Sequence, residues 1–299
     1  MKIGSEIIRK AVTVVLVIAS SFCLDAFAKG SRGGAAQPPL NSADFSVFSK
    51  DDTLDVFLLV GQSNMKGRGE IDLKPPVDKK ILFFHSKKEK HYIARDPLHA
   101  QGTPDKIDRG DNSGTGPGMS FAQALRKKNS DLNILLVPAA VGGAPIAPYG
   151  DKGKLYTRSL MLTKKAIKDS KLKVNIKAIL WLQGESDSTD SRYKSYEEKL
   201  LDLVDRYRKD LKNPTLPFIA CTVGSFITSK NFNRTKEINQ VLLELPKKRK
   251  YTACIDARDI KGHIGDRLHY NTKSQVEIGK RFAKEYMKMT KLTTKEIRN

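Results

Sequence analysis

Short apolar runs alternate with longer segments of helical periodicity along most of the chain. The runs have the length and composition of buried strands, and the longer segments repeat their apolar positions at helical spacing. Strands are predicted at residues 54–60, 80–84, 134–137, 176–182, 218–223 and 251–255, and helices at 119–128, 155–168, 193–212, 235–245 and 272–289. This alternation predicts an α/β fold whose parallel sheet is covered by helices on both faces.

The N-terminus has a different pattern. Basic residues precede the apolar run 11–18, and Ala26-Phe27-Ala28 supplies small residues for a cleavage point. This order predicts a secretory signal peptide over residues 1–28, and hence a secreted or periplasmic protein. A retained membrane anchor is the alternative, although the apolar run is shorter than the roughly 20 residues that a span needs.

The rest of the chain is interpreted as one domain. Residues 29–50 are rich in Gly, Ala, Pro and Ser and are predicted to form a flexible linker. Residues 51–290 are long enough for a single large α/β domain, and residues 291–299 are predicted to be a polar tail. No later stretch is apolar enough to cross a bilayer, so no membrane span is expected after signal cleavage.

Composition adds a strong positive charge. The formal net charge is +21, which can attract nucleic acid, anionic membranes or acidic polysaccharides. The basic residues are scattered and no nucleic-acid motif accompanies them, so a general surface bias is favoured and no nucleic-acid partner is expected. Cys221 and Cys254 each lie in a predicted strand, either as two buried thiols or as a disulfide. The sequence contains neither a metal-binding cluster nor a phosphate-binding glycine loop, so no cofactor is expected.

Polar and glycine-rich segments follow several of the predicted strands. They are Gly61-Gln62-Ser63-Asn64, Val141-Gly142-Gly143, Gln183-Gly184-Glu185-Ser186-Asp187 and, after a short loop, Asp266-Arg267-Leu268-His269. In parallel sheets, functional groups gather beyond the carboxyl ends of the strands. The four segments are therefore expected at one edge of the sheet.

Together these segments hold the groups that acyl transfer needs. Ser63 is a candidate nucleophile, His269 a candidate base, and Asp266, three residues earlier, can orient the imidazole. Backbone N–H groups of Ser63 and Gly143 and the side-chain amide of Gln183 could stabilise the oxyanion. Taken alone, Ser63 could equally be a helix-capping residue. The other four histidines have no comparable setting.

The same motifs resemble a known family. Gly61-Gln62-Ser63-Asn64-Met65 with Gly67-Arg68-Gly69, the 183–187 segment, and Asp266-x-x-His269 are similar to the signature blocks of the sialate O-acetylesterase-like family of SGNH hydrolases, over about residues 53–290. That family includes carbohydrate acetyl esterases active on acetylated xylan. The resemblance implies a three-layer α/β/α sandwich similar to flavodoxin, a Ser63–His269–Asp266 triad, and Gly143 and Gln183 in the oxyanion hole.

Five further residues of these blocks are candidates for supporting the site or binding substrate: Gln62, Asn64, Arg68, Glu185 and Asp187. For Glu185 and Asp187 the favoured interpretation is that they hold loops together by accepting backbone N–H bonds. Arg68 could brace Glu185 or another carboxylate of the site.

The resulting hypothesis is an exported serine esterase that removes acetyl groups from a carbohydrate through an acetyl-enzyme. Its partner would be an acetylated carbohydrate substrate. The alternatives are a sialate O-acetylesterase, whose acidic substrate the positive charge would attract, and an inactive carbohydrate- or anion-binding module. The sequence leaves the sugar and the oligomeric state open.

Overall fold

The fold is built around a seven-stranded sheet. The computed structural model describes residues 39–72, 78–99, 113–170 and 172–296, which belong to one compact unit. The strand order is β3-β2-β4-β1-β5-β6-β7, and every neighbouring pair is parallel except β2 and β3. The strands are β1 (Thr53–Gly61), β2 (Ile81–His85), β3 (Lys90–Ile93), β4 (Asn133–Pro138), β5 (Lys173–Leu182), β6 (Phe218–Cys221) and β7 (Thr252–Ile255).

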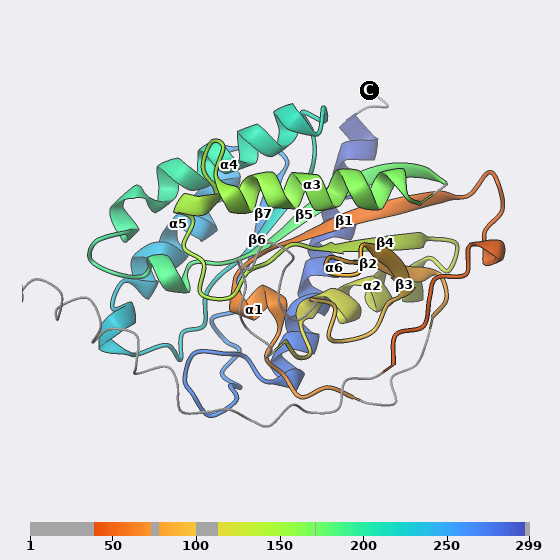
Figure 1. The fold of residues 1–299 in the computed structure, drawn as a ribbon. Coiled ribbons are helices and arrows are strands. Elements are labelled where there is room, and N and C mark those ends of the chain that lie inside the picture. Colours follow the sequence, from red (N-terminus) through yellow and green to blue (C-terminus); the bar gives the residue numbers. More distant parts are fainter. Residues whose placement is uncertain (1–38, 73–77, 100–112, 171, 297–299) are drawn as a thin grey trace, which may run out of the picture. The chain divides into compact units, whose positions relative to one another are not determined.

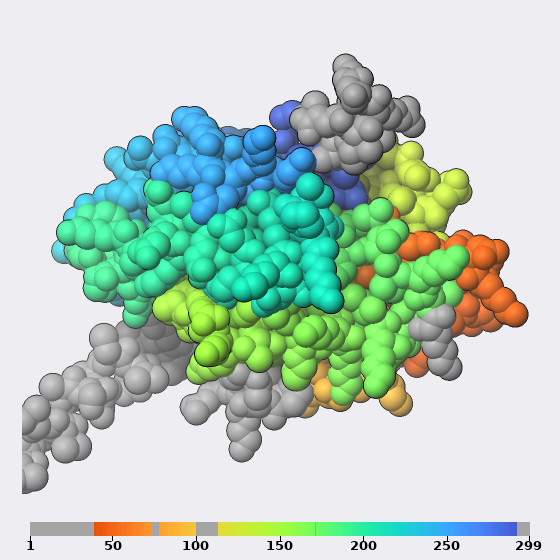
Figure 2. All heavy atoms as spheres, turned by 90° about the horizontal axis from the view of Figure 1, so that it is seen from above, coloured from red at the N-terminus to blue at the C-terminus, as the bar shows by residue number. Residues whose placement is uncertain are grey.

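Helices cover both faces of this sheet (Figure 1). On one face the core contains apolar residues of α3, α4 and α5, and Figure 2 shows these helices side by side over that face. On the other face the core contains residues of α2 and α6. The helices are α1 (Ser63–Lys66), α2 (Pro117–Lys128), α3 (Lys154–Lys168), α4 (Tyr196–Asp210), α5 (Thr235–Lys248) and α6 (Thr272–Glu296). The predicted three-layer α/β/α sandwich is therefore confirmed.

The central strand β1 shows why its sequence is continuously apolar. Val56 and Leu58 point into the core under α3, α4 and α5, whereas Phe57 and Leu59 point into the core under α2 and α6. Because successive side chains of a strand point to opposite faces, a strand covered on both sides has no polar face. All four side chains are at most 1% exposed.

The structure departs from the sequence prediction at the sheet edge, in the predicted linker and in the predicted tail. β3 forms an antiparallel hairpin with β2 at the sheet edge, and no strand was predicted there. Residues 41–43 pair with β3 through main-chain hydrogen bonds, so this part of the predicted linker is joined to the folded unit. α6 continues to Glu296, into the predicted polar tail. The predicted signal peptide and residues 29–38 lie outside the described residues.

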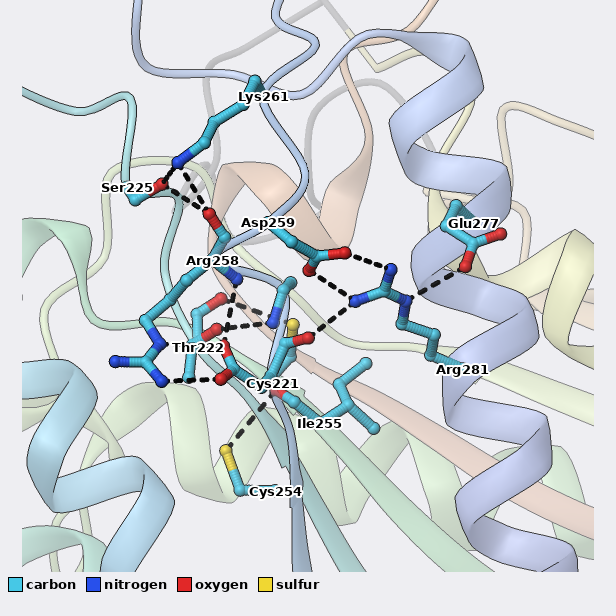
Figure 3. A network of polar contacts seen from close by, with 12 residues as sticks. Cys221, Thr222, Ser225, Cys254, Ile255, Arg258, Asp259, Lys261, Glu277 and Arg281 are labelled. Carbon is cyan, nitrogen blue, oxygen red and sulfur yellow. Dashed lines mark hydrogen bonds and ion pairs between the residues drawn. The ribbon is translucent and has the colours of Figure 1, made fainter.

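The two strand cysteines are free thiols rather than a disulfide. Cys221 on β6 belongs to the core under α2 and α6, whereas Cys254 on β7 packs against the core under α3, α4 and α5. The two side chains therefore leave the sheet on opposite faces, as Figure 3 also indicates. Burial raises the pKa of both thiols above the ordinary value. In the described part of the chain, no helix combines the length and apolar character of a membrane span.

Candidate active site

The site begins where β1 ends. Gly61 has φ +142°, and a Cβ on it would lie 2.1 Å from the carbonyl oxygen of Leu182 at the end of β5. Only glycine fits this close approach. The chain turns here, Gln62 donates its N–H to the Leu182 oxygen at 3.0 Å, and α1 starts at Ser63. Ser63 is thus the first residue of a short helix at the carboxyl end of the sheet, and Gln62 occupies the N-cap position.

Ser63, His269 and Asp266 form one line of hydrogen bonds. Nε2 of His269 lies 2.9 Å from Oγ of Ser63, and Nδ1 of His269 lies 2.6 Å from Oδ2 of Asp266. With the proton on Nδ1, the imidazole donates to Asp266 and accepts from the Ser63 hydroxyl. Ser63 is 4% exposed, whereas the His269 side chain is 17% exposed. The three residues that the sequence predicted are therefore brought together with the geometry of a nucleophile, a base and an orienting carboxylate.

Asp266 is held as a carboxylate by its own loop. Its Oδ1 accepts the backbone N–H groups of Leu268 and His269, both at 2.9 Å. Burial alone raises the pKa of Asp266, but the hydrogen bonds from the His269 ring and from these N–H groups outweigh burial and bring that pKa well below its usual range. The charged form that orients a histidine is thus favoured.

A second histidine, His263, organises the same loop. Its Nδ1 accepts the N–H groups of Gly265 and Arg267 at 3.0 and 3.3 Å, and its ring packs on Phe226. This role could not be predicted from the sequence, because the acceptors of a turn are set by backbone conformation rather than by residue type.

The chain leading into the Asp266–His269 loop is tied to α6 (Figure 3). Arg281 donates to both carboxylate oxygens of Asp259 at 2.6 Å and to the carbonyl oxygen of Asp256 at 2.7 Å. Glu277, one turn earlier on α6, accepts a fourth hydrogen bond of Arg281 at 3.0 Å. A bidentate guanidinium–carboxylate pair fixes both distance and orientation, so the segment after β7 is anchored before it reaches Asp266.

Two backbone N–H groups are available at the site. Gly143 is exposed and has φ +67°, and a Cβ placed on it would meet no atom within 4 Å. Within the described ranges, neither the Ser63 N–H nor the Gly143 N–H has a hydrogen-bond acceptor. The first turn of a helix leaves such N–H groups free. Both predicted backbone N–H groups can therefore donate to an incoming oxyanion.

Gln183 is placed differently from the expectation. Its side chain is wholly buried, and Nε2 lies 2.5 Å from Oδ2 of Asp187, 3.1 Å from the carbonyl oxygen of Ala144 and 3.2 Å from Oε1 of Gln62. Since an amide nitrogen has two hydrogens, these acceptors use both of them. In this conformation the amide donates into the protein.

Glu185 and Asp187 are both buried carboxyl groups with partners in the protein. Asp187 Oδ2 accepts the N–H of Ile146 at 2.8 Å as well as the Gln183 amide. Glu185 Oε1 accepts from Nδ2 of Asn64 at 2.5 Å. Burial raises the pKa of each carboxyl, and these hydrogen bonds partly offset the rise. Both residues join separate segments of the chain. Asp187 does so by accepting a backbone N–H, as the sequence analysis favoured, whereas Glu185 accepts a side-chain amide.

The remaining predicted residues, Gln62 and Arg68, make hydrogen bonds near Ser63. Oε1 of Gln62 accepts the N–H of Ser186 and an amide hydrogen of Gln183, both at 3.2 Å. Arg68 donates to the carbonyl oxygen of Gly67 at 3.2 Å, and Glu185 is bound by Asn64 rather than by Arg68. Among the described residues, no group of His, Cys, Asp and Glu side chains is arranged to hold a metal ion.

Known proteins are similar to this chain in both sequence and structure. Residues 53–288 match the family described as carbohydrate esterase, sialic acid-specific acetylesterase. A probable carbohydrate esterase of Arabidopsis thaliana is 31% identical over 249 residues, which are 78% of this chain and 90% of that protein. Its crystal structure superposes with a TM-score of 0.67, covering 78% of this chain and 98% of the plant chain.

More distant structures share the fold. NanS is 18% identical, with a TM-score of 0.62 over 82% of this chain and 99% of its own. A carbohydrate acetylesterase from Xanthomonas citri is 19% identical, with a TM-score of 0.55 over 77% of this chain and 55% of its own. Because the family match spans nearly the whole described unit and includes every segment of the site, the chain belongs to the carbohydrate esterase, sialic acid-specific acetylesterase family.

Proposed function

We propose that this protein is a serine O-acetylesterase that removes acetyl groups from carbohydrates through an acetyl-enzyme. The observation that carries the proposal is the continuous hydrogen-bond line from Ser63 through His269 to Asp266. Family membership supports an ester of a carbohydrate as the substrate. An inactive binding module would have no need for a base within hydrogen-bond reach of a serine hydroxyl.

In the first half of the reaction, the Ser63 hydroxyl attacks the acetyl carbonyl carbon while Nε2 of His269 takes its proton. Asp266 stabilises the resulting imidazolium, because its carboxylate already accepts the Nδ1 hydrogen. The tetrahedral intermediate collapses when the imidazolium gives its proton to the departing sugar oxygen. The sugar alcohol leaves, and the acetyl group remains on Oγ of Ser63.

In the second half, water takes the place of the sugar. His269 removes a proton from the water as it attacks the acetyl-enzyme, and then returns that proton to Oγ of Ser63 as acetic acid leaves and ionises in solvent. The oxyanion of both tetrahedral intermediates is assigned to the N–H groups of Ser63 and Gly143, which have no acceptor within the described ranges. Gln183 would join them only if its amide turned away from Asp187.

The test is hydrolysis of p-nitrophenyl acetate, followed by acetylated xylan, acetylated pectin and O-acetylated sialic acid. Ser63→Ala and His269→Ala should each retain the wild-type melting temperature and lose about 10⁴-fold or more in kcat, and the double variant should lose little more. A matched control is Ser225→Ala, which removes a serine hydroxyl that donates to the carbonyl oxygen of Arg258 away from the triad. Near-normal turnover by Ser63→Ala would remove the serine mechanism.

A sialate O-acetylesterase is the second candidate within the same chemistry. The family description and the net charge of +21 favour it, because sialic acid carries a carboxylate. The substrate panel decides between them: preference for O-acetylated sialic acid over neutral acetyl-xylan, measured as kcat/KM, supports the acidic substrate. Inertness toward every ester would leave the binding module as the remaining function.

Export belongs to the same proposal. The charged and apolar N-terminal regions support cleavage after Ala28 and a secreted or periplasmic product. Intact mass analysis of the protein recovered outside the cytoplasm should find a chain that begins at Lys29. A full-length chain that begins at Met1 in the membrane fraction would instead support the retained anchor.

A further inference from the structure

Asn64, the residue after the proposed nucleophile, contacts the chain on both sides of His269. Its Nδ2 donates to the carbonyl oxygen of Leu268 at 3.1 Å, and its Oδ1 accepts the N–H of Tyr270 at 3.0 Å. One side chain therefore binds the peptide groups before and after the base. Asn64 is wholly buried, so neither bond competes with water. The separation of Ser63 and His269 thus depends on one intervening amide.

Glu185 fixes the direction of that amide. The second hydrogen of Nδ2 donates to Oε1 of Glu185 at 2.5 Å. A flipped amide would present its oxygen to the Leu268 carbonyl and to Glu185, and its nitrogen to the Tyr270 N–H, so all three bonds would be lost. Gln275 on α6 adds a fourth constraint, because its Nε2 donates to the backbone oxygen of Asn64 at 3.0 Å.

A buried carboxyl is a costly way to orient an amide. Glu185 is wholly buried, and its Oε2 has no hydrogen-bond partner. Burial raises the pKa of Glu185, whereas the Asn64 hydrogen bond and the nearby charge of His269 lower it again. Oε1 of Glu185 accepts from Asn64, so removal of Glu185 would leave one Nδ2 hydrogen of this buried amide without its acceptor. The Asn64 amide could then turn away from the peptide groups on either side of His269.

We propose that Asn64 and Glu185 are positioning residues of the esterase reaction: Asn64 fixes the His269 peptide relative to Ser63, and Glu185 holds the Asn64 amide in the direction that this requires. The inference rests on the proposed function. It goes beyond the triad because it gives the neighbour of the nucleophile and an acidic residue of another loop a joint effect on the base. A displacement of about 1 Å can cost on the order of 10² in rate, so the first effect is large enough to measure.

The chain offers a matched control for Asn64. Asn239 is 5% exposed, and its side chain binds one residue in the same two-point way: Oδ1 accepts the Val223 N–H at 2.8 Å and Nδ2 donates to the Val223 oxygen at 3.1 Å. Asn64→Ala and Asn239→Ala should lower the melting temperature comparably. We expect kcat per folded molecule to fall about 10²-fold for Asn64→Ala, with KM nearly unchanged, and to change little for Asn239→Ala.

Glu185→Ala and Glu185→Gln test the second effect. Alanine removes the acceptor of Asn64 and should lower kcat about 10²-fold with KM nearly unchanged, whereas glutamine keeps an oxygen for Asn64 and should retain most of kcat. NMR chemical shifts of the His269 ring, measured at one fixed pH, report the loss of its hydrogen bond with Ser63 in Asn64→Ala and do not need turnover. They therefore test the inference even if the wild-type protein hydrolyses no ester, which is the outcome that would refute the proposed function.

The two effects can be overturned separately. Equal kcat losses in Asn64→Ala and Asn239→Ala, or His269 ring shifts in Asn64→Ala that match wild type, would show that Asn64 acts only through stability. Full activity of a folded Glu185→Ala protein would remove the orienting role of Glu185. If Glu185→Ala does not fold, a folded Glu185→Gln protein that loses as much kcat as Asn64→Ala would overturn that role as well.

Discussion

Replacing Gln183 by alanine gives a decisive test of how the oxyanion is bound. The resemblance to the family implies a donor role, whereas the structure directs the amide toward Asp187 and the Ala144 oxygen. Loss of a transition-state donor would lower kcat by about 10²–10³ and leave KM and stability nearly unchanged. Loss of an internal tie would chiefly lower stability.

The size of the stability loss follows from the contacts. Gln183→Ala leaves the buried Ala144 oxygen without its donor and removes one of the two donors of Asp187. An orphaned buried acceptor costs about 1–3 kcal/mol, and the space vacated by the side chain adds to this. A total of roughly 2–5 kcal/mol corresponds to a melting temperature lowered by about 5–15 °C in a domain of this size.

Asp187→Ala provides the comparison for Gln183→Ala. Oδ2 of Asp187 accepts both the Ile146 N–H and the Gln183 amide, so alanine breaks the same tie without removing Gln183. The structure predicts that both variants have a lower melting temperature. It also predicts that any fall in kcat is similar in the two variants, because both loosen the loop that follows Gly143. A Gln183→Ala protein that keeps its melting temperature and loses 10²-fold or more in kcat, beside a fully active Asp187→Ala protein, would refute this reasoning.

Three further predictions follow from single features of the structure. Gly143→Ala should lower kcat and cost about 1 kcal/mol in unfolding free energy, because φ is +67° although the added Cβ would meet no atom within 4 Å. Asparagine tolerates this backbone conformation better, so Gly143→Asn should recover part of the kcat in the esterase assay and part of the unfolding free energy in denaturant titration. His99 accepts the Ala140 N–H, and burial together with the nearby charges of Lys66 and Arg158 depresses its pKa well below the ordinary 6.5. The contribution of His99 to the unfolding free energy should therefore be complete above about pH 6.5 and decline as the pH falls below it. His99→Gln should flatten that pH dependence, and an unaltered slope would exclude His99 as its cause. If the net charge of +21 steers an acidic substrate, added salt should lower kcat/KM for acetylated pectin and hardly change it for neutral acetyl-xylan, and an equal response would leave the charge without a role in substrate capture.

Each member of the proposed triad has a local signal in the sequence, and the structure places the His269 side chain within hydrogen-bond distance of the other two. Ser63 follows a strand that is buried on both faces, so the change from apolar to polar residues marks the end of that strand in the sequence. Asp266 and His269 are three residues apart, and this short spacing lets one turn of chain bring the carboxylate to Nδ1. Local patterns of this kind do not depend on how distant elements pack.

The direction of Gln183 could not be obtained in that way. Alternation along β5 places Leu182 in the core under α2 and α6, so the next side chain belongs to the opposite face. Whether that position opens to solvent or closes depends on the 144–146 loop, which returns to the same point from β4. The β3 edge strand was missed for a related reason: Lys90–Ile93 is short, and its pairing with β2 is a tertiary choice.

The segment after β5 has a structural role that becomes clear only when its residues are considered together. Asp187 and Gln183 bind the Ile146 N–H and the Ala144 oxygen, on either side of Pro145. Glu185, through Asn64, is linked to the Tyr270 N–H and the Leu268 oxygen, on either side of His269. In both cases a buried acidic residue binds an amide, and the pair is joined to two peptide groups of a loop that carries a residue of the proposed mechanism. Because both carboxylates lie within one turn of chain, a shift of this segment would move the base and the Gly143 donor together, and their spacing relative to Ser63 would be preserved or lost as a unit.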